Sequence, residues 1–154
     1  MPSLESHRLL EELTTTVKQG MEEIQPLYDY STTVLQQRPA GGGWSVVEVL
    51  FHLNYYADYY TKAMETAMAT RPTTPSRRTS SFKSGWLGNY FTRIIGPRDE
   101  EGELPMKMQS PPGAVPPAPS QLNPQQELDQ YMAHQRKLLK LLHQAHSFDL
   151  GRIR

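Results

Sequence analysis

Apolar side chains recur every three or four residues between residues 4 and 36, which is the spacing of an amphipathic helix. They stand at positions 9, 10, 13, 17, 21, 24, 27, 28, 34 and 35. Pro26 has no backbone N–H, and its ring clashes with the preceding turn, so we expect a kink or break there. The stretch RPAGGG, residues 38–43, then predicts a loop.

A second helix is predicted to begin at the stretch WSVVEV, residues 44–49. Ser45 is the expected N-cap, and Glu48 three residues later has the spacing of a capping box. Trp44 before the cap and Val49 within the first turns fit a hydrophobic staple. We expect this helix to run to about residue 69. The residues expected to share its buried face are Val46, Leu50, Leu53, Ala57, Tyr60 and Met64.

Residues 70–123 form a proline-rich excursion between the second helix and the last one. Apolar pairs at 86/87, 90/91 and 94/95 predict a short amphipathic helix near 82–95. The remainder has polyproline character, and a loop of this length is expected to be functional or wrapped over the surface.

The last helix is predicted to begin after Asn123, with Pro124 at its first position and Gln126 completing an Asn-x-x-Gln cap. Its expected apolar face carries Leu128, Tyr131, Met132, Leu138, Leu139, Leu142 and Ala145. The pattern therefore predicts a single all-α domain over residues 1–154.

Charge and composition narrow the classes of function. The chain has 16 basic and 16 acidic residues, and this balance argues against nucleic-acid binding and against a polybasic membrane anchor. It has no cysteine, which excludes disulfides and thiolate chemistry. No apolar run approaches the ~20 residues of a membrane span, and no signal peptide is recognisable. We expect a cytoplasmic protein.

The histidines are the candidate metal ligands. His52 lies at the edge of the second helix's apolar stripe, beside several tyrosines, so it is either a boundary histidine or a ligand. His143 and His146 are three residues apart and could reach one metal, although their position near a helix end favours interaction with the helix dipole. No phosphate loop, nucleophile elbow or paired-carboxylate motif identifies a catalytic residue or an organic cofactor.

The order of these features resembles the DinB-like superfamily of small four-helix bundles, which includes the YfiT-type suspected metal-dependent hydrolases. The resemblance covers nearly the whole chain and is carried by Trp44-Ser45-x-x-Glu48-x-x-x-His52, by KMQSP at 107–111 and by DL-x-R-x-R at 149–154. It implies an up-and-down four-helix bundle, here with a long proline-rich loop and a short extra helix.

The resemblance also implies a divalent metal of the zinc or nickel type, held by three histidines and acting as Lewis acid or hydroxide source. His52 occupies the position of the ligand on the second helix. The other two belong to a His-x-x-x-His pair on a fourth helix, and this sequence ends at Arg154, where the linker to that helix would begin. The ligand role does not carry over to His143 and His146. We therefore expect an incomplete site and no tight binding of a transition metal.

Two functions follow from the resemblance. The first is a metal-dependent enzyme of the hydrolase or thiol-dependent transferase type. The alternative is a non-catalytic helical scaffold or dimerisation module. A bundle without its fourth helix bares an apolar groove, so we expect a homodimer that buries it. The side chains expected in the groove include parts of Leu50, Leu53, Tyr60, Leu138 and Leu142.

Overall fold

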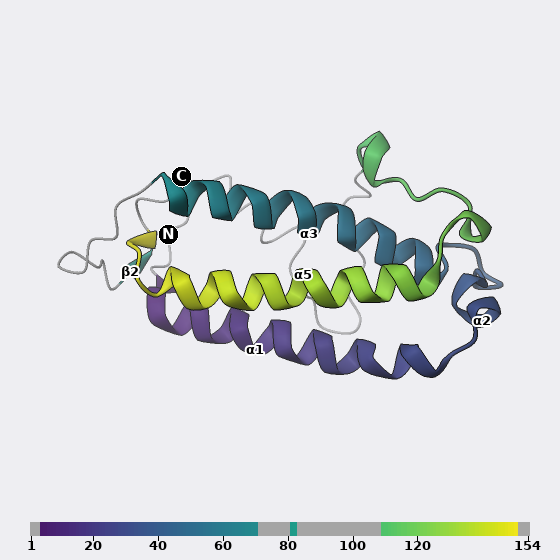
Figure 1. Cartoon of the computed structure of the whole chain (residues 1–154), viewed down its shortest axis with the longest axis horizontal. Coiled ribbons are helices and arrows are strands. Elements are labelled where there is room, and N and C mark those ends of the chain that lie inside the picture. Colours follow the sequence, from purple (N-terminus) through teal and green to yellow (C-terminus); the bar gives the residue numbers. More distant parts are fainter. Residues whose placement is uncertain (1–3, 71–80, 83–108, 151–154) are drawn as a thin grey trace.

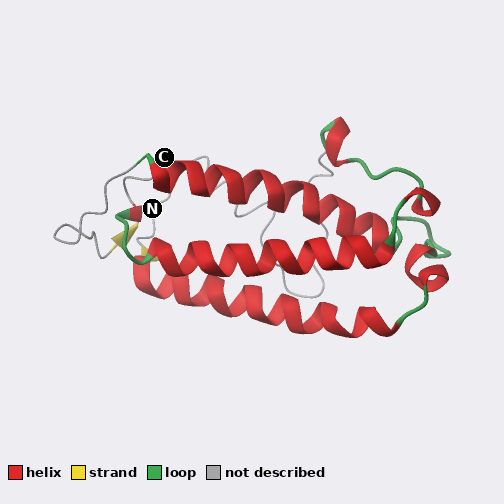
Figure 2. Cartoon of the chain, viewed as in Figure 1, coloured by secondary structure: helices red, strands yellow, loops and turns green. Residues whose placement is uncertain are grey.

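The computed structural model describes residues 4–70, 81–82 and 109–150, and within them the fold is all-α, as predicted (Figures 1 and 2). The long helices are α1 (Ser6–Ile24), α3 (Val46–Ala69) and α5 (Pro124–Ala145). The shorter ones are α2 (Thr32–Gln36) and the 3-10 turns η1 (Gln25–Asp29), η2 (Pro112–Ala114) and η3 (Pro119–Gln121). Strands β1 (Leu4–Glu5) and β2 (Ser81–Phe82) form one short antiparallel pair, with Leu4 opposite Phe82.

The breaks along the chain follow the predicted signals. Helix α1 ends at Ile24, and the 3-10 turn that contains Pro26 follows directly, which confirms the expected break. Ser31 then caps α2 by accepting a hydrogen bond from the Val34 N–H at 3.4 Å. At α5, the Asn123 side chain accepts from the Gln126 N–H at 3.2 Å, with Pro124 at the first position, as predicted.

Helix α5 lies between α1 and α3 and packs against both (Figure 1). It runs antiparallel to α1, because Tyr28 after α1 bonds Asp129 near the start of α5. It runs parallel to α3, because Asn54 bonds Glu127 at one end and Glu65 pairs with Lys137 toward the other. Helices α3 and α5 therefore start at the same end of the bundle. The long connection 70–123 makes this possible, since it returns the chain to the end from which α3 started.

The core consists of two apolar clusters near opposite ends of the helices. One contains Leu10, Leu142 and Ala145. The other contains Leu35, Leu50 and Leu128 and fixes α2 against α3 and α5. No helix in the described part of the chain is long and apolar enough to cross a bilayer.

The buried face of α3 is rotated from the one we predicted. Its buried residues are Val47, Glu48, Leu50, Asn54 and Thr61. Leu53 and Tyr60, which we expected on this face, are 41% and 58% exposed. The prediction followed the most apolar positions, but two polar residues, Asn54 and Thr61, occupy core positions, so the apolar stripe and the buried face do not coincide.

Only part of the proline-rich excursion is described. Phe82 lies in β2, and the rest of the helix expected near 82–95 falls outside the described residues. Residues 109–122 wrap over the surface of the bundle: Ala114 and Leu122 are buried, and the Leu122 carbonyl accepts from the Gln36 amide at 3.0 Å. That the whole chain forms a single domain stays a prediction.

The start of α3 is built around the carboxylate of Glu48, which is completely buried. It accepts hydrogen bonds from the Ser45 N–H and the Ser45 hydroxyl, both at 2.8 Å, within the predicted capping box. Arg38 donates to both of its oxygens, from Nε at 2.9 Å and from Nη2. The Arg38 hydrogen bonds, with those of Ser45, hold the pKa of Glu48 at about 2 although burial opposes the charge.

Glu48→Gln keeps the shape of the side chain but removes its charge, so we expect it to lower the free energy of unfolding by about 1–3 kcal/mol. Urea denaturation followed by circular dichroism measures this. Glu65→Gln is the matched control, because the side chains of the Glu65–Lys137 pair are 48% and 33% exposed and its loss should cost at most about 0.5 kcal/mol. Equal effects of the two substitutions would contradict the role given to Glu48.

The lowered pKa of Glu48 also predicts how stability depends on pH. A carboxyl whose pKa is lower in the folded state stabilises the fold above its ordinary pKa of 4.5, and that contribution is lost as the pH falls toward about 2. The stability difference between the unmodified chain and Glu48→Gln should therefore shrink over this interval. Urea midpoints measured across the range would show it, and a difference that stays constant would rule out this linkage.

Candidate functional site

His52 lies two turns into α3, on the side that the proline-rich segment covers. Its ring stands 4.9 Å from the Trp44 ring and 5.0 Å from the Tyr56 ring, measured between centroids. Trp44 thus packs on His52 rather than serving only as the staple partner of Val49, which is exposed. The aromatic neighbours hold the imidazole at the surface of α3 in a defined orientation.

The Nδ1 atom of His52 lies 2.8 Å from the carbonyl oxygen of Ala114. A carbonyl oxygen only accepts hydrogen bonds, so Nδ1 carries the hydrogen. In the neutral ring, Nε2 then keeps its lone pair. Histidines that bind metals commonly donate their other ring N–H to a carbonyl in this way.

The segment that carries Ala114 is packed tightly against α3. Ala114 is fully buried within η2, and its N–H donates to the Pro111 carbonyl at 2.8 Å. A Cβ added to Gly113 would lie 2.9 Å from Cε2 of Tyr55, closer than real side-chain contacts allow. The absence of a side chain at Gly113 therefore lets the segment approach α3 closely enough for Ala114 to reach His52.

The described residues do not complete a metal site around His52. They contain no group of three or more His, Cys, Asp or Glu side chains that could hold a metal ion. His52 fits one ligand position by its tautomer and its surroundings, and the other described residues do not supply the rest of the site.

The two histidines near the end of α5 lie elsewhere, beside α1. His143 is in the last turn, and His146 is the C-cap residue, with its ring 5.1 Å from that of His7. Both line a shallow pocket together with α1 residues such as Glu11 and Lys18. The structure does not bring them to His52.

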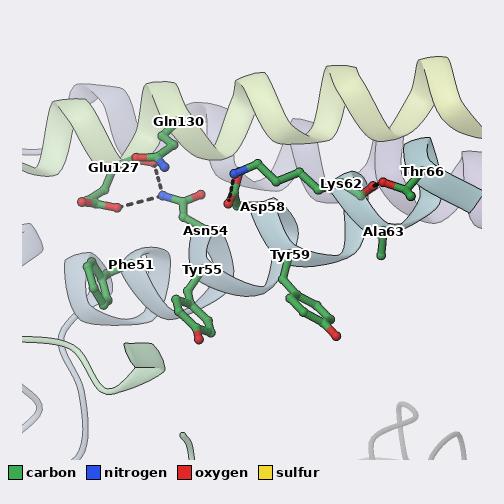
Figure 3. A pocket seen from close by; sticks show the side chains of 10 residues that line it. All are labelled: Phe51, Asn54, Tyr55, Asp58, Tyr59, Lys62, Ala63, Thr66, Glu127 and Gln130. Atoms are coloured by element: carbon green, nitrogen blue, oxygen red, sulfur yellow. Dashed lines mark hydrogen bonds and ion pairs between the residues drawn. The ribbon is translucent and has the colours of Figure 1, made fainter. Parts of the chain in front are cut away.

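A polar cluster that we did not predict lies on the seam between α3 and α5. Asn54 and Glu127 are both buried, and the Asn54 amide donates to the Glu127 carbonyl at 3.0 Å and to its carboxylate at 2.8 Å. Further along α3, Lys62 pairs with Asp58 at 2.7 Å. Figure 3 shows Asn54 between Glu127 and Asp58 along this seam. The signal in the sequence was an asparagine four residues after Leu50, at a core spacing.

His134 on α5 lies close to the same seam. Its Nε2 atom is buried without a hydrogen-bond partner in the described part of the chain. Burial lowers the pKa of His134, whereas the nearby Asp58 carboxylate raises it and Lys137 and Lys62 lower it further. The neutral form is therefore favoured at this position.

Comparison with known proteins agrees with the fold. A family model described as the DinB superfamily matches residues 8–154. No curated protein and no solved structure matches the chain significantly. The family match covers nearly all of the sequence, including the capping box of α3 and the proline-rich segment that contacts His52, and it shows that the chain belongs to the DinB superfamily.

Proposed function

We propose that the chain is a metal-dependent enzyme of the DinB superfamily, of the hydrolase or thiol-dependent transferase type, with His52 as a ligand of its divalent metal. The observation that supports this is the hydrogen bond from His52 Nδ1 to the Ala114 carbonyl. It fixes the tautomer and leaves Nε2 free, as a metal-binding imidazole requires. A cytoplasmic location stays a prediction from the sequence.

The surroundings of His52 support the same role. Trp44 and Tyr56 contact its ring, and Ala114 holds one nitrogen, so the side chain loses little freedom when Nε2 binds a ligand. A boundary histidine with its tip in water would not need a buried carbonyl partner. The described residues contain no group of three or more His, Cys, Asp or Glu side chains that could hold a metal ion, so His52 alone does not define a reaction.

Titration with zinc or nickel tests the role of His52. We expect a saturable site weaker than submicromolar, since one imidazole is far short of the three protein ligands of catalytic zinc. His52→Ala should weaken it by about tenfold or more. His143→Ala is the matched control, because it removes an exposed histidine that could bind nickel at the surface.

A spectroscopic measurement makes the same test without a substitution. The 15N shifts of the His52 ring should report the Nδ1–H tautomer in the metal-free protein, and added zinc should move the Nε2 signal. Metal binding that His52→Ala leaves unchanged, or that His143→Ala abolishes, would contradict the proposal.

A second candidate function is a helical dimerisation module, and the exposed side of α3 favours it. Val49 and Leu53 are each 41% exposed, and Tyr60 is exposed on the same side of the helix. Leu50 and Leu142, which we expected to line the groove in part, are buried in the core. The 49/53/60 side of α3 is therefore one apolar surface in the described part of the chain that is open to a second copy.

Sedimentation of the chain at micromolar concentration tests this second function. We expect a dimer, and we expect Leu53→Glu to convert it to a monomer, because a carboxylate would be buried without a partner at the contact. Thr66→Glu places the same charge on another side of α3 and should leave the dimer intact. A monomeric unmodified chain would exclude the module.

A further inference from the structure

We propose that a row of aromatic side chains on α3, formed by Phe51, Tyr55 and Tyr59, is a docking surface for a proline-rich segment of a partner protein. The row borders a groove of about 590 Å³. The proposal is independent of metal binding and goes beyond the two functions proposed above. It rests on the exposed rings, on the shape of the groove, and on a proline-rich segment of this chain that already packs against the same row.

The three rings lie along one line of α3. They are four residues apart, and Figure 3 shows them on the same side of the helix, pointing away from α5. Tyr55 is 41% exposed and Tyr59 is 63% exposed. The Tyr60 ring contacts the Tyr59 ring edge to face, at 5.3 Å between centroids and 81° between planes. Tyr59 thus presents a restrained ring, and a ligand that covers it removes apolar surface from water.

The kind of ligand is indicated by the segment of this chain that packs on Tyr55. This segment is PPGAVPPAP, residues 111–119. Its backbone lies directly on the ring, because a Cβ added to Gly113 would be 2.9 Å from Cε2 of Tyr55. The row therefore already holds a proline-rich chain at one of its rings, and Tyr59 continues the row one turn further along α3.

The groove has room for an extended ligand. Pro111 and Ala118, on either side of the η2 turn, have φ/ψ values of −59°/151° and −57°/141°, which are close to polyproline II. Beyond the rings the groove is lined by the small side chains of Ala63 and Thr66. From Tyr55 to Thr66 the helix rises about 16 Å, and about five residues of polyproline II span the same length.

The charges along the groove favour an uncharged ligand. Lys62 pairs with Asp58 at 2.7 Å, so neither offers an isolated charge to a partner. A proline-rich segment binds aromatic side chains without needing charges of its own. It is also extended before it binds, so it loses little conformational entropy on docking.

A partner protein, rather than a second copy of this chain, is the source of the segment. The chain's own proline-rich residues in the described part are held on their own bundle. Ala114 is fully buried there, and the Leu122 carbonyl accepts from the Gln36 amide at 3.0 Å. Docking them on a second copy would break these contacts.

Decaproline with capped ends is the probe, added to the full chain without metal and followed through the ring signals of 13C-labelled tyrosine. We expect saturable binding with a Kd of about 1 mM or lower, with shifts at Tyr59. A capped Gly-Ser peptide of the same length is also uncharged but is not extended before binding. It should bind at least about tenfold more weakly.

Four variants locate the contact. Tyr59→Ala should weaken decaproline binding about three- to tenfold, whereas Tyr59→Phe keeps the ring and should stay within about twofold of the unmodified chain. Ala63→Lys places a long side chain in the groove one turn further along and should also weaken binding. Leu53→Glu lies on the side of α3 offered to a second copy and should leave binding unchanged.

Several results would overturn the proposal. These are no binding of decaproline at millimolar concentration, equal binding of the Gly-Ser peptide, equal losses in Tyr59→Phe and Tyr59→Ala, and binding that neither Tyr59→Ala nor Ala63→Lys alters. Loss of binding in Leu53→Glu would overturn it as well, because the peptide would then occupy the face offered to a second copy.

Discussion

The buried carboxylate of Glu48 is the interaction on which the arrangement of this bundle depends. A carboxylate removed from water is unfavourable unless hydrogen bonds and an opposite charge replace the solvent. Ser45 supplies two hydrogen bonds and Arg38 supplies the charge, so the loop that follows α2 and the start of α3 meet at one group. The α2–α3 loop and the first turn of α3 are thereby fixed together. The rotation of α3 about its own axis is set at the same point.

The second constraint is the parallel pairing of α3 with α5. Helices that run in the same direction cannot be joined by a tight turn, so the chain needs a long connection. Part of that connection is used for packing, because η2 contacts α3 and buries Ala114. The Ala114 carbonyl then orients His52, and Gly113 allows the close approach. A topological requirement thus places a backbone acceptor beside the candidate metal ligand.

Local signals were predictable from the sequence, whereas partners distant in sequence were not. The break at Pro26, the Asn123 cap and the Ser45–Glu48 box depend on residues within one turn of each other, and the structure bears them out. The buried side of α3 was misassigned because Asn54 and Thr61 are polar, and a polar residue is read as exposed unless its partner is known. The partner of Asn54 is Glu127, and no periodicity connects two residues so far apart. The ion pair between Arg38 and Glu48 was not predicted for a related reason, because Arg38 lies in a loop that has no regular residue spacing.

The rotation of α3 matters because two different surfaces of this helix carry chemistry. His52 and Asn54 are two residues apart, which places them about 200° apart around the helix axis. One faces the proline-rich segment, where Ala114 selects its tautomer, and the other faces α5, where Glu127 selects its amide orientation. A rotation of α3 that improved one contact would weaken the other. Glu48 lies four residues before His52 and six before Asn54 and is held from two directions, so it sets the single rotation at which both side chains meet their partners.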